Sequence, residues 1–340
     1  GQLLIGDWSG SPLDIQIREI TLAKPSTELL AQRAAKVVKV NQEIARKREQ
    51  ARREEEARQK MLREGAEHPE DGPEVQYVCA VAPHILALTI QEKRRIPGGQ
   101  VPYQAQPDDE IRVEKKDHAY LAWEDGRPTT SYARSVWRKD DESGKLKRLG
   151  LLVDQGRTIT TDSRLEGQAI TSETLTESAA YRIGIADDPG EVVQPTDVFR
   201  KSKPLDRADN GQATIRHIVY LKLAEPLQEG IPYTIELHGI NTRQPLVTHT
   251  HEPYKVRSEA VHVSHVGFRP DDPLKRAYLS VWLGTGGKLA YDVQRFELID
   301  AKSGQSVHQG DVRLAVPAEQ VEMMRPEKNH NRTNVYHLDF

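Results

Sequence analysis

Short apolar stretches separated by Gly, Pro, Asp and Asn run from Val75 to Phe340, and they constrain the fold more than any other feature of the sequence. Their length and spacing are typical of antiparallel strands in β-sandwiches, and no strong helical periodicity interrupts them. One long segment of helical character lies upstream. We therefore predict a mainly β protein, made of immunoglobulin-like or fibronectin-like β-sandwich domains and one long charged α-helix.

The β-rich part divides into two blocks. The first, residues 75–256, contains VQYVCAVA, HILALTIQ, AAYRIGI, TIRHIVYLKLAEPL and IPYTIELHGI as predicted strands. It is large for one immunoglobulin-like sandwich, so it is either one sandwich with long insertions or two small ones. Within it, IRVEKKD and HAYLAWEDG look like a hairpin. The second block, residues 257–340, begins with the alternating segment AVHVSHVGF and continues with RAYLSVWLG, DVQRFELID, SVHQGDVRL and NVYHLDF.

Residues 25–66 are predicted to form a long helical spacer, because neither Pro nor Gly occurs between Pro25 and Gly65. Leu30, Val37 and Ile44 repeat every seven residues, whereas the second half is almost entirely charged. Three interpretations remain open: a spacer docked by its N-terminal half, a helix that pairs with another chain, and a binding element. The polar residues 67–74 are predicted to be a linker.

Residues 1–24 contain one predicted strand, LDIQIREITL, in which Leu13, Ile15 and Ile17 alternate with polar residues. A single strand cannot form a domain, so it either pairs elsewhere in the chain or belongs to an upstream domain. The pattern GDW…IQIREITL resembles the last strand of a jelly-roll carbohydrate-binding domain. We therefore expect residues 1–24 to be a remnant of such a domain.

Composition excludes several classes of protein. The 340 residues carry a formal net charge of −3, which gives no general attraction to nucleic acid or to anionic membranes. No apolar run approaches the roughly 20 residues that span a bilayer. Cys79 is the one cysteine, so no disulfide within the chain is possible, and its apolar neighbours predict a buried thiol.

The second block resembles the immunoglobulin-like domain that precedes the catalytic domain in glycoside hydrolase family 9, the cellulase family. The segments that carry the resemblance are HVSHVGFRP (262–270), KRA (275–277), FELIDAKSGQSVHQG (296–310) and the final VYHLDF. Ser264, His265 and Phe268 depart from the family pattern, which has Asn, Gln and Tyr there. The resemblance implies that this domain is incomplete at its C-terminus. It also implies a downstream catalytic domain or polypeptide, with the paired aspartates and the general-acid glutamate of an inverting O-glycosyl hydrolase.

The expected function follows from that resemblance. The chain is expected to be the non-catalytic N-terminal part of a polysaccharide-degrading enzyme, to support the catalytic domain and to contact polysaccharide. The implied location is extracellular or at the cell surface, with a bacterial periplasm as a further option. The alternative is a structural or adhesive β-sandwich protein with a helical stalk or pairing helix. No catalytic apparatus or cofactor site is recognised in the sequence, so whether the chain is itself an enzyme stays open.

Four aromatic residues are the candidates for carbohydrate contact: Tyr120, Trp123, Tyr132 and Trp137. Sugar rings stack on exposed aromatic faces, so such a cluster is typical of a carbohydrate platform. Tyr and Trp also fill the cores and interfaces of β-sandwiches, which is the competing interpretation.

Other titratable residues are weaker candidates. His249, His251, His262 and His265 lie within 17 positions of one another and offer imidazole ligands for zinc or another late transition metal, although His-x-His in a β protein usually marks a solvated strand face. No metal is therefore expected. Inverting hydrolysis needs two carboxyl groups about 6.5–9.5 Å apart. Paired aspartates occur at Asp108–Asp109, Asp140–Asp141, Asp187–Asp188 and Asp271–Asp272, and all are predicted to lie in polar turns without burial.

Overall fold

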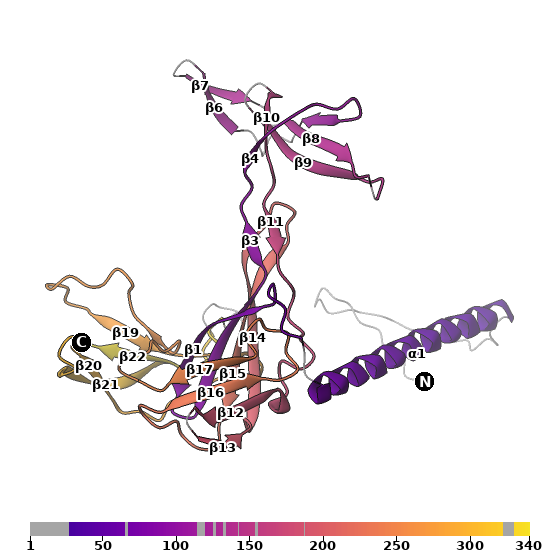
Figure 1. Cartoon of the computed structure of the whole chain (residues 1–340). Helices are drawn as coiled ribbons and strands as arrows, with labels where there is room; N and C mark the ends of the chain where they lie inside the picture. The colour runs from indigo at the N-terminus through magenta and orange to yellow at the C-terminus, as the bar shows by residue number, and fades with distance from the viewer. Residues whose placement is uncertain are drawn as a thin grey trace, which may run out of the picture. The chain divides into compact units, whose positions relative to one another are not determined.

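The structure is a computed structural model that describes residues 27–64, 67–113, 120–124, 127–131, 134–141, 143–153, 156–186, 188–321 and 330–340. It is mainly β with antiparallel sheets and the long helix α1, so the predicted fold class is confirmed (Figure 1). The predicted strand in residues 1–24 lies outside the described residues. In the described part of the chain, no helix is long and apolar enough to cross a membrane.

Helix α1 spans Thr27–Glu64 and includes 38 residues, as the absence of Pro and Gly predicts. Ion pairs along its surface stabilise it, among them Glu43 with Lys47 at 3.1 Å and Glu49 with Arg53 at 2.9 Å. Two residues of the predicted stripe are exposed, Val37 at 57% and Ile44 at 43%.

The first block forms one β-sandwich rather than two. One sheet has the order β1-β2-β15-β14 and the other β13-β12-β16-β17. Their bounds are β1 Glu74–Ala82, β2 Ile85–Glu92, β12 Tyr181–Ile185, β13 Asp188–Val193, β14 Asp197–Arg207, β15 Ala213–Lys222, β16 Pro232–Leu237 and β17 Leu246–Thr250. With the strands lettered in chain order, these sheets are ABED and C′CFG, which is the immunoglobulin-like arrangement.

An insertion between β2 and β12 accounts for the large size of this block. It contains β3 Arg94–Ile96, β4 Gln100–Pro102, β5 Glu110–Val113, β6 Tyr120–Glu124, β7 Arg127–Ser131, β8 Arg134–Lys139, β9 Leu146–Val153, β10 Thr158–Thr160 and β11 Arg164–Glu166. Strands β3 and β11 pair with each other, and a separate sheet has the order β4-β10-β9-β8-β5. The predicted hairpin of IRVEKKD with HAYLAWEDG is wrong, because β5 pairs with β8 and β6 pairs with β7.

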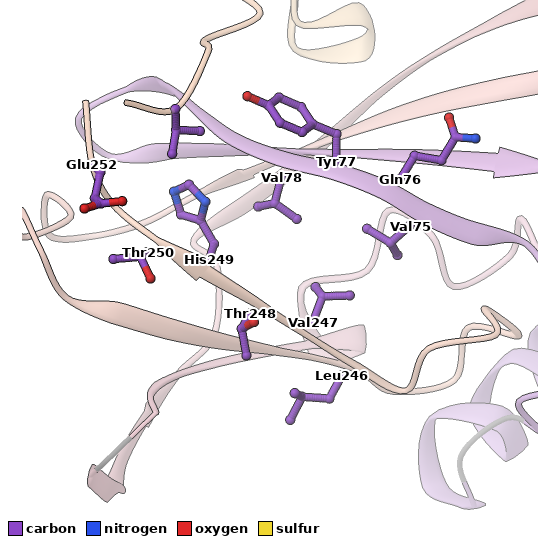
Figure 2. A pocket seen from close by; sticks show the side chains of 11 residues that line it. Val75, Gln76, Tyr77, Val78, Leu246, Val247, Thr248, His249, Thr250 and Glu252 are labelled. Atoms are coloured by element: carbon purple, nitrogen blue, oxygen red, sulfur yellow. The ribbon is translucent and has the colours of Figure 1, made fainter. Parts of the chain in front are cut away.

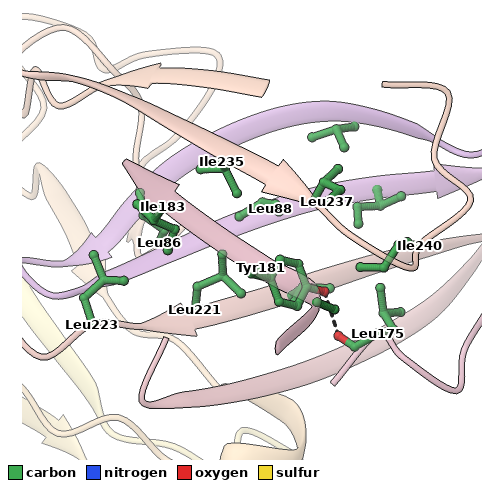
Figure 3. Packing of buried hydrophobic residues seen from close by; sticks show 14 of the residues in the cluster. Leu86, Leu88, Leu175, Tyr181, Ile183, Leu221, Leu223, Ile235, Leu237 and Ile240 are labelled. Carbon is green, nitrogen blue, oxygen red and sulfur yellow. Dashed lines mark hydrogen bonds between the residues drawn. The ribbon is translucent and has the colours of Figure 1, made fainter. Parts of the chain in front are cut away.

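The main core lies between the two sheets of the sandwich (Figure 3). Leu88 of β2 and Leu221 of β15 face Ile183 of β12 and Ile235 of β16, and each is at most 1% exposed. Tyr181 is also fully buried, and its hydroxyl donates a 2.7 Å hydrogen bond to the Leu175 carbonyl. This bond satisfies the one polar group that the ring brings into the core.

The second block forms a five-stranded sheet of order β18-β19-β22-β21-β20. Its strands are β18 Val261–His262, β19 Arg276–Leu279, β20 Arg295–Ile299, β21 Ser306–Val316 and β22 Val335–Asp339. Only the start of AVHVSHVGF is a strand. Gly267 lies in a turn with a φ of 77°, a conformation that glycine adopts without strain. We call this the terminal sheet.

A second core joins the terminal sheet to the outer face of sheet β1-β2-β15-β14. Cys79, Ile218 and Tyr220 from the sandwich pack against Val281 and Leu283. Cys79 is 2% exposed, so the predicted burial of its thiol is confirmed. The sheet is thus buried on both faces, which explains why β2 begins with the continuous apolar run ILAL (85–88) rather than with an alternating pattern.

Candidate functional site

The predicted carbohydrate platform lies on the insertion. Tyr120 and Trp123 belong to β6, but the structure does not describe their side chains. Tyr132 lies outside the described residues. Trp137 on β8 is half-buried, and its indole N–H donates a 2.9 Å hydrogen bond to Ser135 Oγ. The guanidinium of Arg112 lies 4.6 Å from the ring centroid, so this cation covers one face of Trp137.

The Asp108–Asp109 pair is not a simple solvated turn. The side chain of Asp109 is only 3% exposed, so the expectation of an unburied carboxylate is wrong at this position. Arg138 donates two hydrogen bonds to it, at 2.7 and 2.9 Å, and Tyr103 Oη donates a third at 2.7 Å. The Arg138 bonds hold the pKa of Asp109 far below its ordinary value. Burial, and then Asp109, raise the pKa of Tyr103 to about 12.

Replacing Asp109 with Asn is expected to destabilise the insertion by about 2 kcal/mol, because Arg138 loses a charged hydrogen-bond partner. The pKa of Asp109 is lower in the folded state, so its contribution is present above about pH 4 and is lost as the pH falls. Hydrogen exchange of the β5 and β8 amides measures the effect. The matched control is Asp108→Asn at the exposed neighbour. Equal exchange in both variants would contradict a role for the Asp109 network.

The four histidines occupy different environments. His249 on β17 is 6% exposed, and its ring centroid lies 6.3 Å from that of His251. His262 on β18 places Nε2 2.9 Å from the Ser280 carbonyl oxygen, and His265 is exposed in a turn. Among the residues that the structure describes, no group of three or more His, Cys, Asp or Glu side chains is arranged to hold a metal ion.

A groove of about 660 Å³ lies between β1 and β17, the first and last strands of the sandwich (Figure 2). Residues 75–78 and all of β17 line it, together with Glu252 and Val256. The lining combines valine and leucine side chains with an exposed tyrosine, Tyr77, whose hydroxyl is anchored on the Arg257 carbonyl. Gln76, Thr248 and Glu252 add amide, hydroxyl and carboxylate groups.

His249 is the most unusual residue of this groove. Its Nε2 atom is buried and has no hydrogen-bond partner among the described residues. Burial, and then the charge of His251, lower its pKa, so the ring is neutral at pH 7. An unpaired buried nitrogen is costly unless a ligand or water satisfies it.

The two strand edges that border the groove differ. The edge of β1 is covered by side chains: Gln244 bonds both backbone groups of Val75, and Ser258 Oγ donates to the Ala80 carbonyl at 2.7 Å. On either side of β17, the backbone groups of Pro245 and His251 form hydrogen bonds with the chain of the neighbouring strand β16 and the residue before it. Because hydrogen-bonded and non-hydrogen-bonded residues alternate along an antiparallel strand, the backbone groups of residues 246, 248 and 250 point away from β16. The groove can thus offer hydroxyl, amide, imidazole and backbone groups to a polar ligand with apolar faces.

No known protein family, no curated protein and no protein of solved structure matches this chain.

The groove could not be predicted from the sequence, because residues 75–78 and 246–250 are far apart in the chain and neither segment has a functional motif. The one signal in the sequence is His249, whose residue type suggests a metal ligand rather than part of a groove. Strands β1 and β17 belong to different sheets, and their position beside each other could not be predicted from local patterns.

Proposed function

We propose that the chain is the non-catalytic N-terminal part of a polysaccharide-degrading enzyme similar to glycoside hydrolase family 9. In this role it supports a downstream catalytic domain or polypeptide and contacts polysaccharide outside the cell, at the cell surface or in a periplasm. The observation that carries the proposal is a terminal sheet with one apolar and one polar face, firmly joined to the sandwich.

The polar face of the terminal sheet carries charged side chains. The carboxylate of Asp339 forms ion pairs with Arg276 and Arg313 on the neighbouring strands. The apolar face is formed by Ala277, Leu279, Phe296, Leu298, Val312, Leu314, Tyr336 and Leu338, as the strand register and alternation require. The segment around Tyr291 covers part of this face, while Leu298 is 38% and Leu314 is 51% exposed. We assign the uncovered part to the contact with the catalytic domain.

We assign polysaccharide contact to the groove between β1 and β17. A sugar has apolar C–H faces and a rim of hydroxyl groups. Tyr77 supplies an aromatic ring, while Gln76, Thr248 and Glu252 supply hydrogen-bonding groups.

Affinity electrophoresis in native gels that contain soluble β-glucan, xylan or mannan tests this function. We expect at least one polysaccharide to retard the 340-residue chain, and we expect no reducing sugar to be released in a parallel assay. Thr248→Trp fills the groove at an exposed position and should weaken the retardation at least fivefold. Val307→Trp, at a 61% exposed position of β21, is the matched control and should leave it unchanged.

Each other outcome has a definite meaning. Release of reducing sugar would replace the accessory role with that of a complete enzyme. Retardation that Thr248→Trp leaves intact would move the polysaccharide contact away from the groove. Absence of retardation on every polysaccharide would favour the structural alternative.

The alternative is a structural or adhesive protein in which α1 pairs with another chain. The exposed apolar residues Val37 and Ile44 favour it, since they recur on one face of the helix. Sedimentation equilibrium separates the two functions. The accessory role predicts a monomer, whereas pairing predicts a dimer that the double substitution Val37→Ser and Ile44→Ser dissociates.

A further inference from the structure

Three side chains of different chemistry meet on the inner face of sheet β1-β2-β15-β14. Ser202 on β14 is the register partner of His217 on β15, and Ser202 Oγ lies 2.8 Å from His217 Nδ1. On the other side of the imidazole, His217 Nε2 lies 3.6 Å from Glu92 Oε2 at the end of β2. The hydroxyl, imidazole and carboxylate groups therefore form a row across three adjacent strands.

Burial distinguishes this row from an ordinary hydrogen bond on a sheet surface. His217 is 7% and Glu92 is 8% exposed, whereas Ser202 is exposed to solvent. The backbone N–H of Ile170 donates to Glu92 Oε2 at 2.8 Å, which fixes the carboxylate behind the imidazole. An accessible hydroxyl is thus backed by a buried base and a buried acid, the order that nucleophilic catalysis requires.

The protonation state of His217 suits a base. Burial lowers its pKa most, the negative charge of Glu92 opposes this shift, and the positive charge of Arg200 lowers the pKa further. The ring is therefore neutral at pH 7. When Nε2 carries the ring proton and faces Glu92, Nδ1 is free to accept the proton of the Ser202 hydroxyl.

Arg200 supplies a positive charge on the same side of β14. It lies two residues before Ser202, so both side chains extend from the same face of the strand. No ion pair of the Arg200 guanidinium is found among the described residues. Its charge lowers the pKa of His217, and it is available to stabilise negative charge that develops beside Ser202.

We propose that Ser202 is an activated nucleophile for acyl transfer from esters with good leaving groups, with His217 as its general base and Glu92 as the positioning residue. The site goes beyond the proposed accessory function, which does not use it. Ser202 Oγ attacks the ester carbonyl carbon while its proton moves to His217 Nδ1. The C–O bond to the leaving group breaks, and the leaving alkoxide takes up that proton. Water then attacks the acyl-serine, restores the hydroxyl and releases the carboxylic acid.

Labelling with a fluorophosphonate probe tests the nucleophile directly. In this reaction the Ser202 oxygen displaces fluoride from phosphorus, so a P–O bond forms, the P–F bond breaks and the proton passes to His217. Incubation of the full chain followed by peptide mass spectrometry is expected to place the label on Ser202. Ser202→Ala should abolish the label, and His217→Gln should slow labelling at least tenfold. Ser306→Ala, at an exposed serine of β21, is the control and should leave labelling unchanged.

The positioning role of Glu92 has its own readout. The charged groups that act on the imidazole are Glu92 from β2 and Arg200 from β14. Because the Glu92 charge raises the pKa of His217, Glu92→Gln is expected to move the midpoint of the pH–labelling curve to lower pH. A merely structural effect would lower the amplitude or the melting temperature and leave the midpoint in place.

Two results would overturn the proposal. One is the absence of label on Ser202 at probe concentrations that label a serine hydrolase used as a positive control. The other is labelling of Ser202 that is as fast in His217→Gln as in the unmodified chain. Circular dichroism of each variant shows that the sandwich is folded before its labelling rate is compared.

Discussion

Substituting Gly284 with Ala is expected to destabilise the protein by about 3 kcal/mol, through strain and overpacking together. Gly284 begins the 3-10 turn η4 (Gly284–Gly286), which lies against β14. Its φ is 67°, and a Cβ atom there would lie 2.1 Å from the Arg200 carbonyl oxygen. The backbone of the turn would have to move away from β14. The hydrogen bond from the Arg200 N–H to Thr285 Oγ1, at 3.0 Å, would then break.

Gly304→Ala separates the two contributions to this effect. Gly304, in the turn between β20 and β21, has a nearly identical φ of 69°, but a Cβ atom there would meet no heavy atom within 4 Å. This control carries the left-handed strain of roughly 1–2 kcal/mol without a steric clash. Urea unfolding measures both variants, and hydrogen exchange at the Arg200 amide reports the local contact. If both variants lose the same stability, close packing between η4 and β14 is not important for stability.

Leu88→Ala is expected to lower the free energy of unfolding by about 3 kcal/mol, within the usual range for a buried leucine. Leu88 is 0% exposed at the centre of β2 and contributes to the main core of the sandwich. Truncation leaves a cavity that both sheets border, and close-packed strands can collapse into it only partly. Urea unfolding followed by tryptophan fluorescence measures the loss.

The matched control is Leu314→Ala on the apolar face of the terminal sheet, where the leucine is 51% exposed. The same atoms are removed, but most of the side chain already contacts water, so we expect a loss below about 1 kcal/mol. A similar loss in both variants would mean that the main core does not dominate the stability of the sandwich. A large loss at Leu314 alone would mean that a partner covers the apolar face in solution.

Residue type alone predicted only part of the candidate sites. The aromatic residues and histidines were selected because their side chains are typical of binding sites, yet the structure gives them different surroundings. Trp137 is covered on one face by Arg112, and the histidines form no metal-binding group among the described residues. Ser202, His217 and Glu92 were not selected, because the 15 and 110 positions that separate the serine from the other two carry no motif. Their meeting depends on the pairing of β14, β15 and β2.

The sequence by itself determined the local elements. The absence of Pro and Gly predicted α1, and short apolar stretches bounded by turn residues predicted β19, β20, β21 and β22, since these signals depend on neighbours along the chain. Only the tertiary structure decided which strands pair. It placed β8 rather than β6 beside β5, brought β1 and β17 to one groove, and buried both faces of the sheet that contains β2. Many strands of similar pattern can satisfy the same backbone hydrogen bonds, and the choice among them is made by the burial of side chains that are distant in sequence.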